Sequence, residues 1–200
     1  LEHPGLFVKL IDFDKVEPHN VGRQMFTLND VGYHKSDVLI SKINHAFGLD
    51  WDASTEPYNS DIDDSCNLII SAVDNVVTRK LMLEAFYRKH ESYTRDIKKK
   101  YLYLDCGNAR DYGQVILSDF KKKLKNIDSI IPNWDKQDTI EQQGQGCSYA
   151  ESLLEQDLFI NDWVSLYAIT IIKDLLFKKE IDYQGFFFNT SYYLTQKIMI

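Results

Sequence analysis

Two apolar runs that each end on an acidic residue constrain the fold more than any other feature of the sequence. The first, Leu6–Ile11, is followed by Asp12-Phe13-Asp14, and the second, Leu68–Val73, is followed by Asp74. Short continuous apolar runs are typical of strands buried on both faces of a parallel sheet. We therefore expect parallel strands whose carboxyl ends carry carboxylates.

Helical patterns follow both runs. Asp30 is expected to cap a helix that Gly48 ends, and a second helix is expected after Asp74. Asp50–Asp64 is polar and is expected to be a surface connection. The apolar positions that define the two helical faces are Val31, His34, Val38, Ile43 and Phe47, and then Val77, Leu81 and Ala85.

The second half of the chain continues the pattern. Tyr101–Leu104 predicts a third strand that ends at Asp105-Cys106-Gly107-Asn108, and Gln114–Leu117 follows a short turn that favours antiparallel pairing. A loop is expected over Lys121–Asp138, a long helix over Tyr149–Lys178, and one or two strands over Tyr183–Leu194.

Alternation of strands and helices predicts an α/β doubly wound sheet, mostly parallel, with antiparallel strands toward the C-terminus. Ligands of such sheets bind outside the carboxyl ends of the strands. We expect a single domain over residues 1–200, with a nucleotide-binding core at 1–118, a crossover segment at 119–147 and the long helix and terminal strands at 148–200.

Composition and charge make several classes of function less plausible. The formal net charge of −7 disfavours a nucleic-acid or anionic-membrane surface. Lys173 and Asp174 interrupt the longest apolar stretch, so no membrane span is expected, and the absence of a leader predicts a cytoplasmic protein. The spacings of Cys66, Cys106 and Cys147 exclude a disulfide framework and a CxxC zinc site.

Charged residues at the strand ends suggest a nucleotide site. Asp12 is placed to hydrogen-bond ribose hydroxyls. Arg23 and Lys35 together could hold a polyphosphate, and Asp74 is a candidate Mg²⁺ ligand. From the residues alone, simpler roles stay open: strand termination for the first acids, solvated side chains for the two cations, and a helix cap for Asp74.

A longer pattern sharpens this interpretation. Asp12-x-Asp14-x-Val16-x-x-x-Asn20-x-x-Arg23-Gln24, then Lys35, then Asp74-Asn75 with Arg79 five residues after the acid, resembles the ThiF/MoeB and ubiquitin-activating enzyme superfamily. The resemblance extends over about residues 6–180. Within the superfamily, the chain is most similar to the plasmid-borne ThiF-like proteins of the PRTRC system.

The resemblance implies a Rossmann-like, ThiF-like fold and an enzyme that binds ATP and Mg²⁺. Such an adenylyltransferase activates the C-terminal carboxylate of a small β-grasp protein, ubiquitin-like or sulfur-carrier-like, and works as a homodimer. Carried over by position, Asp12 resembles the ribose-binding acid and Lys35 the α-phosphate lysine. The phosphate-contacting loop corresponds to Asn20, Arg23 and Gln24, and the metal-linked acid to Asp74.

Two family features are missing upstream of Asp12: a Gly-rich phosphate loop and an arginine that family dimers donate across their interface. We therefore expect the domain to begin before Leu1, and these 200 residues alone to bind ATP weakly. The paired CxxC cysteines of many relatives are also lacking, so no structural zinc is expected.

Gly146-Cys147-Ser148 follows the Gly-rich segment Gln142–Gly146 and precedes the long helical pattern. In ubiquitin-type activating enzymes, a similar element supplies the thiol that takes the acyl group as a thioester. A thiol near a helix N-terminus has a lowered pKa. Cys147 is therefore either this nucleophile or a buried, incidental cysteine, whereas Cys106 is expected in the core and Cys66 is expected to be inert.

Other functions remain as alternatives. The enzyme could activate a small-molecule or tRNA carboxylate, as some ThiF-like dehydratases do. The chain could instead be an inactive docking subunit, although Asp12, Arg23, Lys35 and Asp74 together argue against a scaffold. NAD-dependent redox chemistry fits less well, because two cations and a metal-binding acid suit a triphosphate better.

Overall fold

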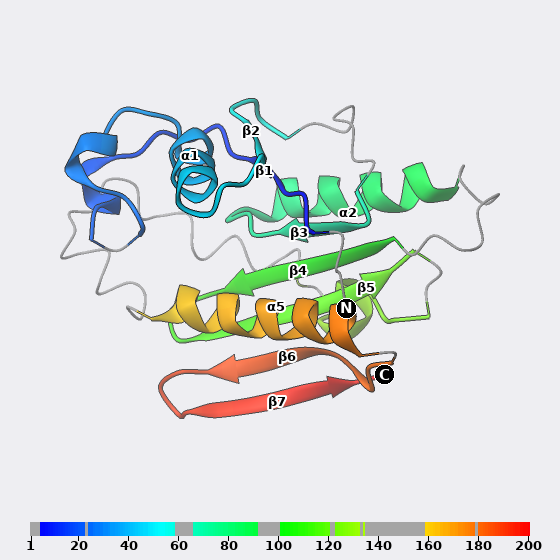
Figure 1. Ribbon diagram of the computed structural model, residues 1–200. Helices are drawn as coiled ribbons and strands as arrows, with labels where there is room; N and C mark the ends of the chain where they lie inside the picture. The colour runs from blue at the N-terminus through cyan, green and yellow to red at the C-terminus, as the bar shows by residue number, and fades with distance from the viewer. Residues whose placement is uncertain are drawn as a thin grey trace. The chain divides into compact units, whose positions relative to one another are not determined.

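The structure, a computed structural model, describes residues 5–22, 24–58, 66–91, 101–120, 123–132, 134, 159–178 and 180–200 (Figure 1). The predicted flexible segment 142–146 and the element around Cys147 lie outside these residues. The chain forms two compact units, Leu1–Asn59 and Ser60–Ile200.

The first unit is built on one short parallel strand pair. β1 (Lys9–Ile11) pairs with β2 (Asp52–Ser54), so that Leu10 lies opposite Ala53. Two 3₁₀ turns, η1 (Pro18–Asn20) and η2 (Leu28–Asp30), and helix α1 (Lys35–Phe47) connect these strands (Figure 1). The first predicted strand is thus shorter than expected. The surface connection predicted over Asp50–Asp64 was wrong in part, because it contains β2.

Helix α1 ends as predicted but begins later. Gly48 has a φ of 63°, the left-handed conformation that glycine adopts readily, and it closes the helix. Asp30 does not cap α1: it is the last residue of η2, and its carboxylate binds the Thr27 backbone N–H and Lys42. The hydrogen bond from Lys42 is the main reason why the pKa of Asp30 is lowered to about 2.

The second unit contains a five-stranded sheet in the order β3-β4-β5-β6-β7. β3 (Leu68–Ser71) runs parallel to β4 (Leu102–Asn108), whereas each later neighbour is antiparallel. The remaining strands are β5 (Tyr112–Asp119), β6 (Tyr183–Asn189) and β7 (Leu194–Met199). The predicted antiparallel fourth strand, the two terminal strands and the change from parallel to antiparallel pairing toward the C-terminus are confirmed.

Helices cover both faces of this sheet. Leu104 and Cys106 of β4 belong to the core formed with helix α5 (Ile160–Phe177). Because alternate residues of a strand point to opposite faces, Tyr103 faces the other way, where its ring lies 5.6 Å from that of Phe86 in helix α2 (Val76–Glu91). A mixed sheet with a helix on each face confirms the predicted α/β, Rossmann-like fold class.

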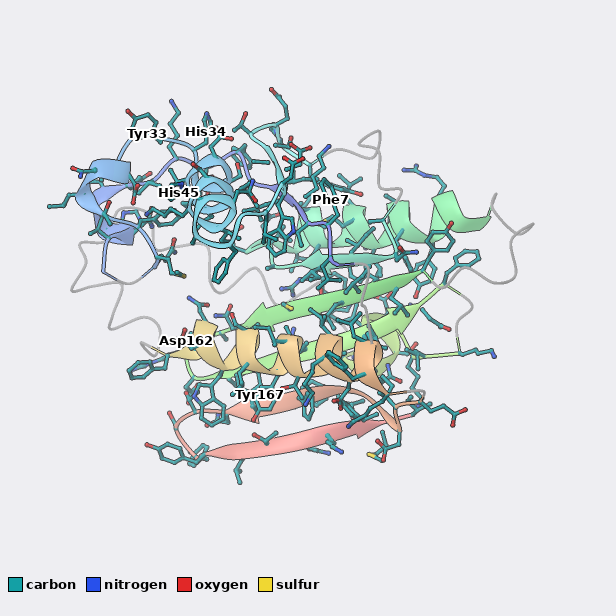
Figure 2. All side chains as sticks on the ribbon, in the orientation of Figure 1. Phe7, Tyr33, His34, His45, Asp162 and Tyr167 are labelled. Atoms are coloured by element: carbon teal, nitrogen blue, oxygen red, sulfur yellow. The ribbon has the colours of Figure 1, made fainter. Side chains whose placement is uncertain are left out.

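Aromatic side chains dominate the α5 side of the core. Figure 2 shows Tyr167 of α5 directed toward β6, and its ring centroid lies 4.7 Å from Phe186 and 5.1 Å from Phe188. The rings of Trp163 and Phe188 stack with centroids 5.9 Å apart. Such pairs add to the free energy gained by burying apolar surface. Phe186 and Phe188 of β6 are therefore core on this face of the sheet, whereas Tyr192 and Tyr193 are exposed.

Three predicted boundaries differ from the structure. β4 continues through Asp105-Cys106-Gly107 to Asn108, because its antiparallel ladder with β5 extends to the pair Asn108 and Gly113. The loop predicted over Lys121–Asp138 contains a one-turn helix, α3 (Ile127–Ile130). In the described part of the long helical pattern, α5 begins at Ile160. None of the described helices has the length and apolar character needed to cross a membrane.

Two isoleucines on α5 provide a matched test of this packing. Ile171 is 0% exposed in the core and Ile169 is 62% exposed on the same helix. Ile171→Ala should lower the free energy of unfolding by about 2–5 kcal/mol, because it leaves a cavity. Ile169→Ala should change it by no more than about 0.5 kcal/mol. Urea denaturation followed by circular dichroism measures both, and equal losses would contradict the placement of α5.

Candidate functional site

The end of β1 and the start of α1 are joined by backbone and side-chain hydrogen bonds in the first unit. The Ser36 hydroxyl is fully buried and donates to the carbonyl of Asp12 at 2.7 Å and to that of Ser54 at 3.2 Å. The Lys35 backbone N–H donates to the Asp14 carbonyl at 2.8 Å. Next to it, the His34 Nδ1 lies 2.9 Å from the Phe13 carbonyl (Figure 2). These contacts bring together Asp12 and Lys35, two of the predicted site residues.

Lys35 and Asp14 form an ion pair at this junction. The Lys35 Nζ lies 3.0 Å from the Asp14 Oδ2, and the lysine side chain is 18% exposed against 50% for the aspartate. The Asp14 backbone N–H donates to Asp12 Oδ1 at 2.9 Å, which orients the Asp12 carboxylate. Lys35 is also the first residue of α1, where the helix dipole is positive. The charge of the Lys35 amine and the positive end of the α1 dipole thus both lie near Asp12 and Asp14.

The loop after Asp14 is held by a buried asparagine. Asn20 is 3% exposed, and its Oδ1 accepts a hydrogen bond from the Glu17 backbone N–H at 2.9 Å. Its backbone carbonyl accepts from the Gln24 N–H at 3.0 Å. Between them, Gly22 has a φ of 81°, which only glycine adopts without strain. Asn20 and Gln24 are therefore on one tight loop, and Arg23 lies outside the described residues.

Asp74 belongs to the second unit and follows β3. Its carboxylate is exposed, and its Oδ1 accepts from the Asn75 Nδ2 at 3.3 Å. The residue that caps α2 is Asn75, whose Oδ1 accepts from the Thr78 backbone N–H at 2.7 Å. The simpler role considered for Asp74, as the helix cap, is therefore wrong.

No group of three or more His, Cys, Asp or Glu side chains that could hold a metal ion occurs within the described part of the chain. Mg²⁺ does not require one, because it is usually held by one or two carboxylates together with substrate phosphates and water. The exposed oxygens of Asp74 fit that kind of shared coordination. They do not fit a metal that the protein holds by itself.

The two described cysteines differ in burial. Cys106 is in the core, as predicted, and burial together with the neighbouring Asp105 raises the pKa of its thiol to about 12. It is therefore not a nucleophile at neutral pH. Cys66 is exposed, and Cys147 lies outside the described residues.

A buried charge pair was not predicted. Asp105 is 1% exposed, and its Oδ1 lies 3.2 Å from the Nε of Arg79, whose side chain comes from the first turn of α2. Burial raises the pKa of Asp105 to about 6, opposed by Arg79 and Gln114. The sequence pattern contains Arg79 but gives no signal for its partner, because Asp105 was expected at the end of a strand and not within one.

The fold and the junction of Asp12, Asp14 and Lys35 place the chain among Rossmann-like α/β proteins with charged residues at the strand ends. The ThiF family model matches residues 7–199, so the chain belongs to the ThiF family. No curated protein matches the chain.

Solved structures share the fold. A crystal structure of E. coli MccB with ATP is 16% identical, with a TM-score of 0.61, and the match covers 96% of this chain and 55% of that one. The crystal structure of selenomethionine PaaA is 13% identical, with a TM-score of 0.61 and the same coverage of both chains. A further structure of E. coli MccB, at 13% identity, has a TM-score of 0.63 and covers 96% of this chain and 54% of that one. The chain thus spans about half the length of the solved proteins that it matches.

The raised pKa of Asp105 predicts a pH dependence of stability. A carboxyl group whose pKa is higher in the folded than in the unfolded state binds its proton more tightly when folded, so its contribution to stability is lost as pH rises from about 4 through 6. Asp105→Asn should remove this loss, on the order of 1 kcal/mol per pH unit. Urea denaturation between pH 4 and 7 measures it, with the exposed Glu84→Gln of α2 as control. Parallel curves for wild type and Asp105→Asn would contradict the burial of a titrating Asp105.

Proposed function

We propose that the protein adenylates the C-terminal carboxylate of a small ubiquitin-like or sulfur-carrier-like β-grasp protein, with ATP as the second substrate. The observation that carries the proposal is the junction of β1 and α1, where Lys35 lies 3.0 Å from Asp14 and next to the backbone of Asp12. Membership of the ThiF family over residues 7–199 supports it. So does the ATP named in a solved structure of MccB, which shares this fold.

In the proposed reaction, a carboxylate oxygen of the carrier attacks the α-phosphorus of ATP. A bond forms between this oxygen and phosphorus, the bond to the oxygen that bridges the α- and β-phosphates breaks, and pyrophosphate leaves. Carboxylate and phosphate are both anionic, so cations at the site lower the barrier by stabilising the charge that builds up in the transition state.

The residues of the first unit have complementary roles in this proposal. Asp12 accepts hydrogen bonds from the ribose hydroxyls, and Lys35 contacts the α-phosphate. Asp14 holds the lysine amine at the junction through their ion pair. Asn20, Arg23 and Gln24 contact the phosphates, and Asn20 does so with the amide end of its side chain, because its Oδ1 accepts from Glu17.

Asp74 is the proposed Mg²⁺ ligand, shared with the phosphates of ATP. Bound there, the ion would neutralise charge on the pyrophosphate leaving group. The further proposal, taken from the family resemblance, is that residues 1–200 belong to one adenylation domain and that the protein acts as a homodimer. The same resemblance supports membership of the PRTRC-type proteins.

Two substitutions test the nucleotide site in the complete natural protein. Lys35→Ala and Asp74→Ala should each lower ATP–pyrophosphate exchange by about 100-fold or more, because each removes a charge that faces the phosphates. Lys9→Ala and Glu84→Ala change exposed residues of β1 and α2 and should leave exchange unchanged. Wild-type exchange in either site variant would contradict the assignment.

Cys147 tests the second step that we propose, in which the thiolate attacks the acyl carbon and releases AMP. Cys147→Ala should retain ATP–pyrophosphate exchange while losing a carrier adduct that thiols cleave. Gel electrophoresis with and without a reducing agent detects the adduct, and Cys66→Ala is the matched control. If the wild-type protein exchanges pyrophosphate but forms no adduct, the enzyme belongs with the sulfur-carrier group.

A further inference from the structure

Arg79 joins the end of β3 to β4 through three contacts of its guanidinium group. Its Nε lies 3.2 Å from the Asp105 Oδ1. Its Nη2 donates to the carbonyl of Cys106 at 3.2 Å and to that of Val73 at 3.4 Å. One side chain thus links α2, the segment after β3 and the middle of β4.

Gly107 lies next to the guanidinium. A Cβ added there would lie 2.9 Å from the Arg79 Nη2 and 2.3 Å from the Gln114 Nε2, so a larger residue would displace the ends of these two side chains. The Arg79 Cζ also lies 5.8 Å from the centroid of the buried Trp134 ring. These neighbours hold the guanidinium in one orientation across β4.

Stability does not explain why such a pair is present. Removing two charges from water costs free energy that the ion pair often fails to recover, and apolar residues of similar size commonly serve as well. The Asp105 carboxylate is 1% exposed, so it carries this cost in full. A buried ion pair with directed hydrogen bonds instead suggests that it holds nearby groups in a defined position.

The segment that Arg79 holds is the one that carries Asp74. Val73, which accepts the hydrogen bond, directly precedes Asp74. On the other side, Asn75 is fixed to α2 by the Thr78 N–H at 2.7 Å and by the Arg79 N–H at 3.2 Å. The exposed carboxylate of Asp74 therefore lies between two anchored residues, with the Asn75 amide on its Oδ1.

We propose that Arg79 and Asp105 are positioning residues that fix the Asp74 carboxylate for the Mg²⁺ of a bound nucleotide, an inference that rests on the function proposed above. Mg²⁺ demands near-octahedral geometry, so a carboxylate that moves by a fraction of an ångström binds it poorly. Residues behind a metal ligand commonly change metal affinity by 10-fold or more when they are substituted.

The test uses Mn²⁺ as a spectroscopic substitute for Mg²⁺. Binding of Mn²⁺ with a non-hydrolysable ATP analogue is measured by electron paramagnetic resonance in the complete natural protein. Arg79→Lys keeps the charge but loses the forked geometry, and should weaken binding by roughly 10-fold. Arg88→Lys, at an exposed position of the same helix, should leave binding unchanged. Hydrogen exchange over residues 72–78 should rise in Arg79→Lys, with no change in β5 and β6.

Asp105→Asn provides a second variant, because it removes the charge and keeps the shape. It should weaken Mn²⁺·nucleotide binding in protein that circular dichroism shows to be folded. A residue with only a structural role would lower stability without changing the affinity of the folded protein.

The outcomes separate this inference from the proposed function. Wild-type Mn²⁺·nucleotide affinity in folded Arg79→Lys and Asp105→Asn would overturn the positioning role, even if the wild-type enzyme exchanges pyrophosphate. Weakened affinity in both variants would support it, even if no exchange with a carrier protein is found. A wild-type protein that binds no Mn²⁺·nucleotide would overturn both proposals.

Discussion

The alternation of residues along β4 determines how the second unit is organised. Leu104 and Cys106 join the core under α5, while Tyr103 packs against Phe86 of α2 and Asp105 pairs with Arg79 of the same helix. A shift of one residue in the pairing of β4 would exchange these two sets and place the carboxylate in the aromatic core. The ladders with β3 and β5 prevent this shift, so backbone pairing fixes where the buried charge lies.

The Lys35–Asp14 ion pair of the first unit is less buried than the Arg79–Asp105 pair of the second. In the part of this unit that the structure describes, the sheet consists of β1 and β2, and the ends of these strands are tied to α1 by the buried hydroxyl of Ser36. Because a serine and backbone groups make these ties, the Asp14 carboxylate remains half exposed and pairs with Lys35, and the half-buried Asp12 lies beside it. In the proposed function, a nucleotide would meet charged groups that the protein has already oriented.

Sequence patterns predicted those strands and helix ends that depend on local residue order. The apolar runs gave β3 and β5, and Gly48 gave the end of α1. The three residues Asp52-Ala53-Ser54 have no strand pattern, and β2 exists only through its pairing with β1. Likewise, Asp30 resembles a helix cap in sequence, but a tight 3₁₀ turn uses its carboxylate before the helix begins. The structure brings Asp12 and Lys35 together, whereas their role as a nucleotide site and their convergence with Asp74 stay predictions.

The Arg79–Asp105 pair shows why a buried ion pair escapes sequence analysis. Asp105 has the sequence context of an exposed strand end, and only the register that places it opposite Ser71 and Ile116 shows that it is buried. Its value to the protein also cannot be judged from stability, because the pair costs solvation and raises the pKa of the acid. The ion pair costs free energy, and Arg79 donates a hydrogen bond to the backbone beside Asp74. Precise positioning of Asp74 therefore explains the pair better than a gain in stability does. Lys35 is likewise a cation at the positive end of a helix, where its ion pair with Asp14 offsets the unfavourable interaction with the helix dipole.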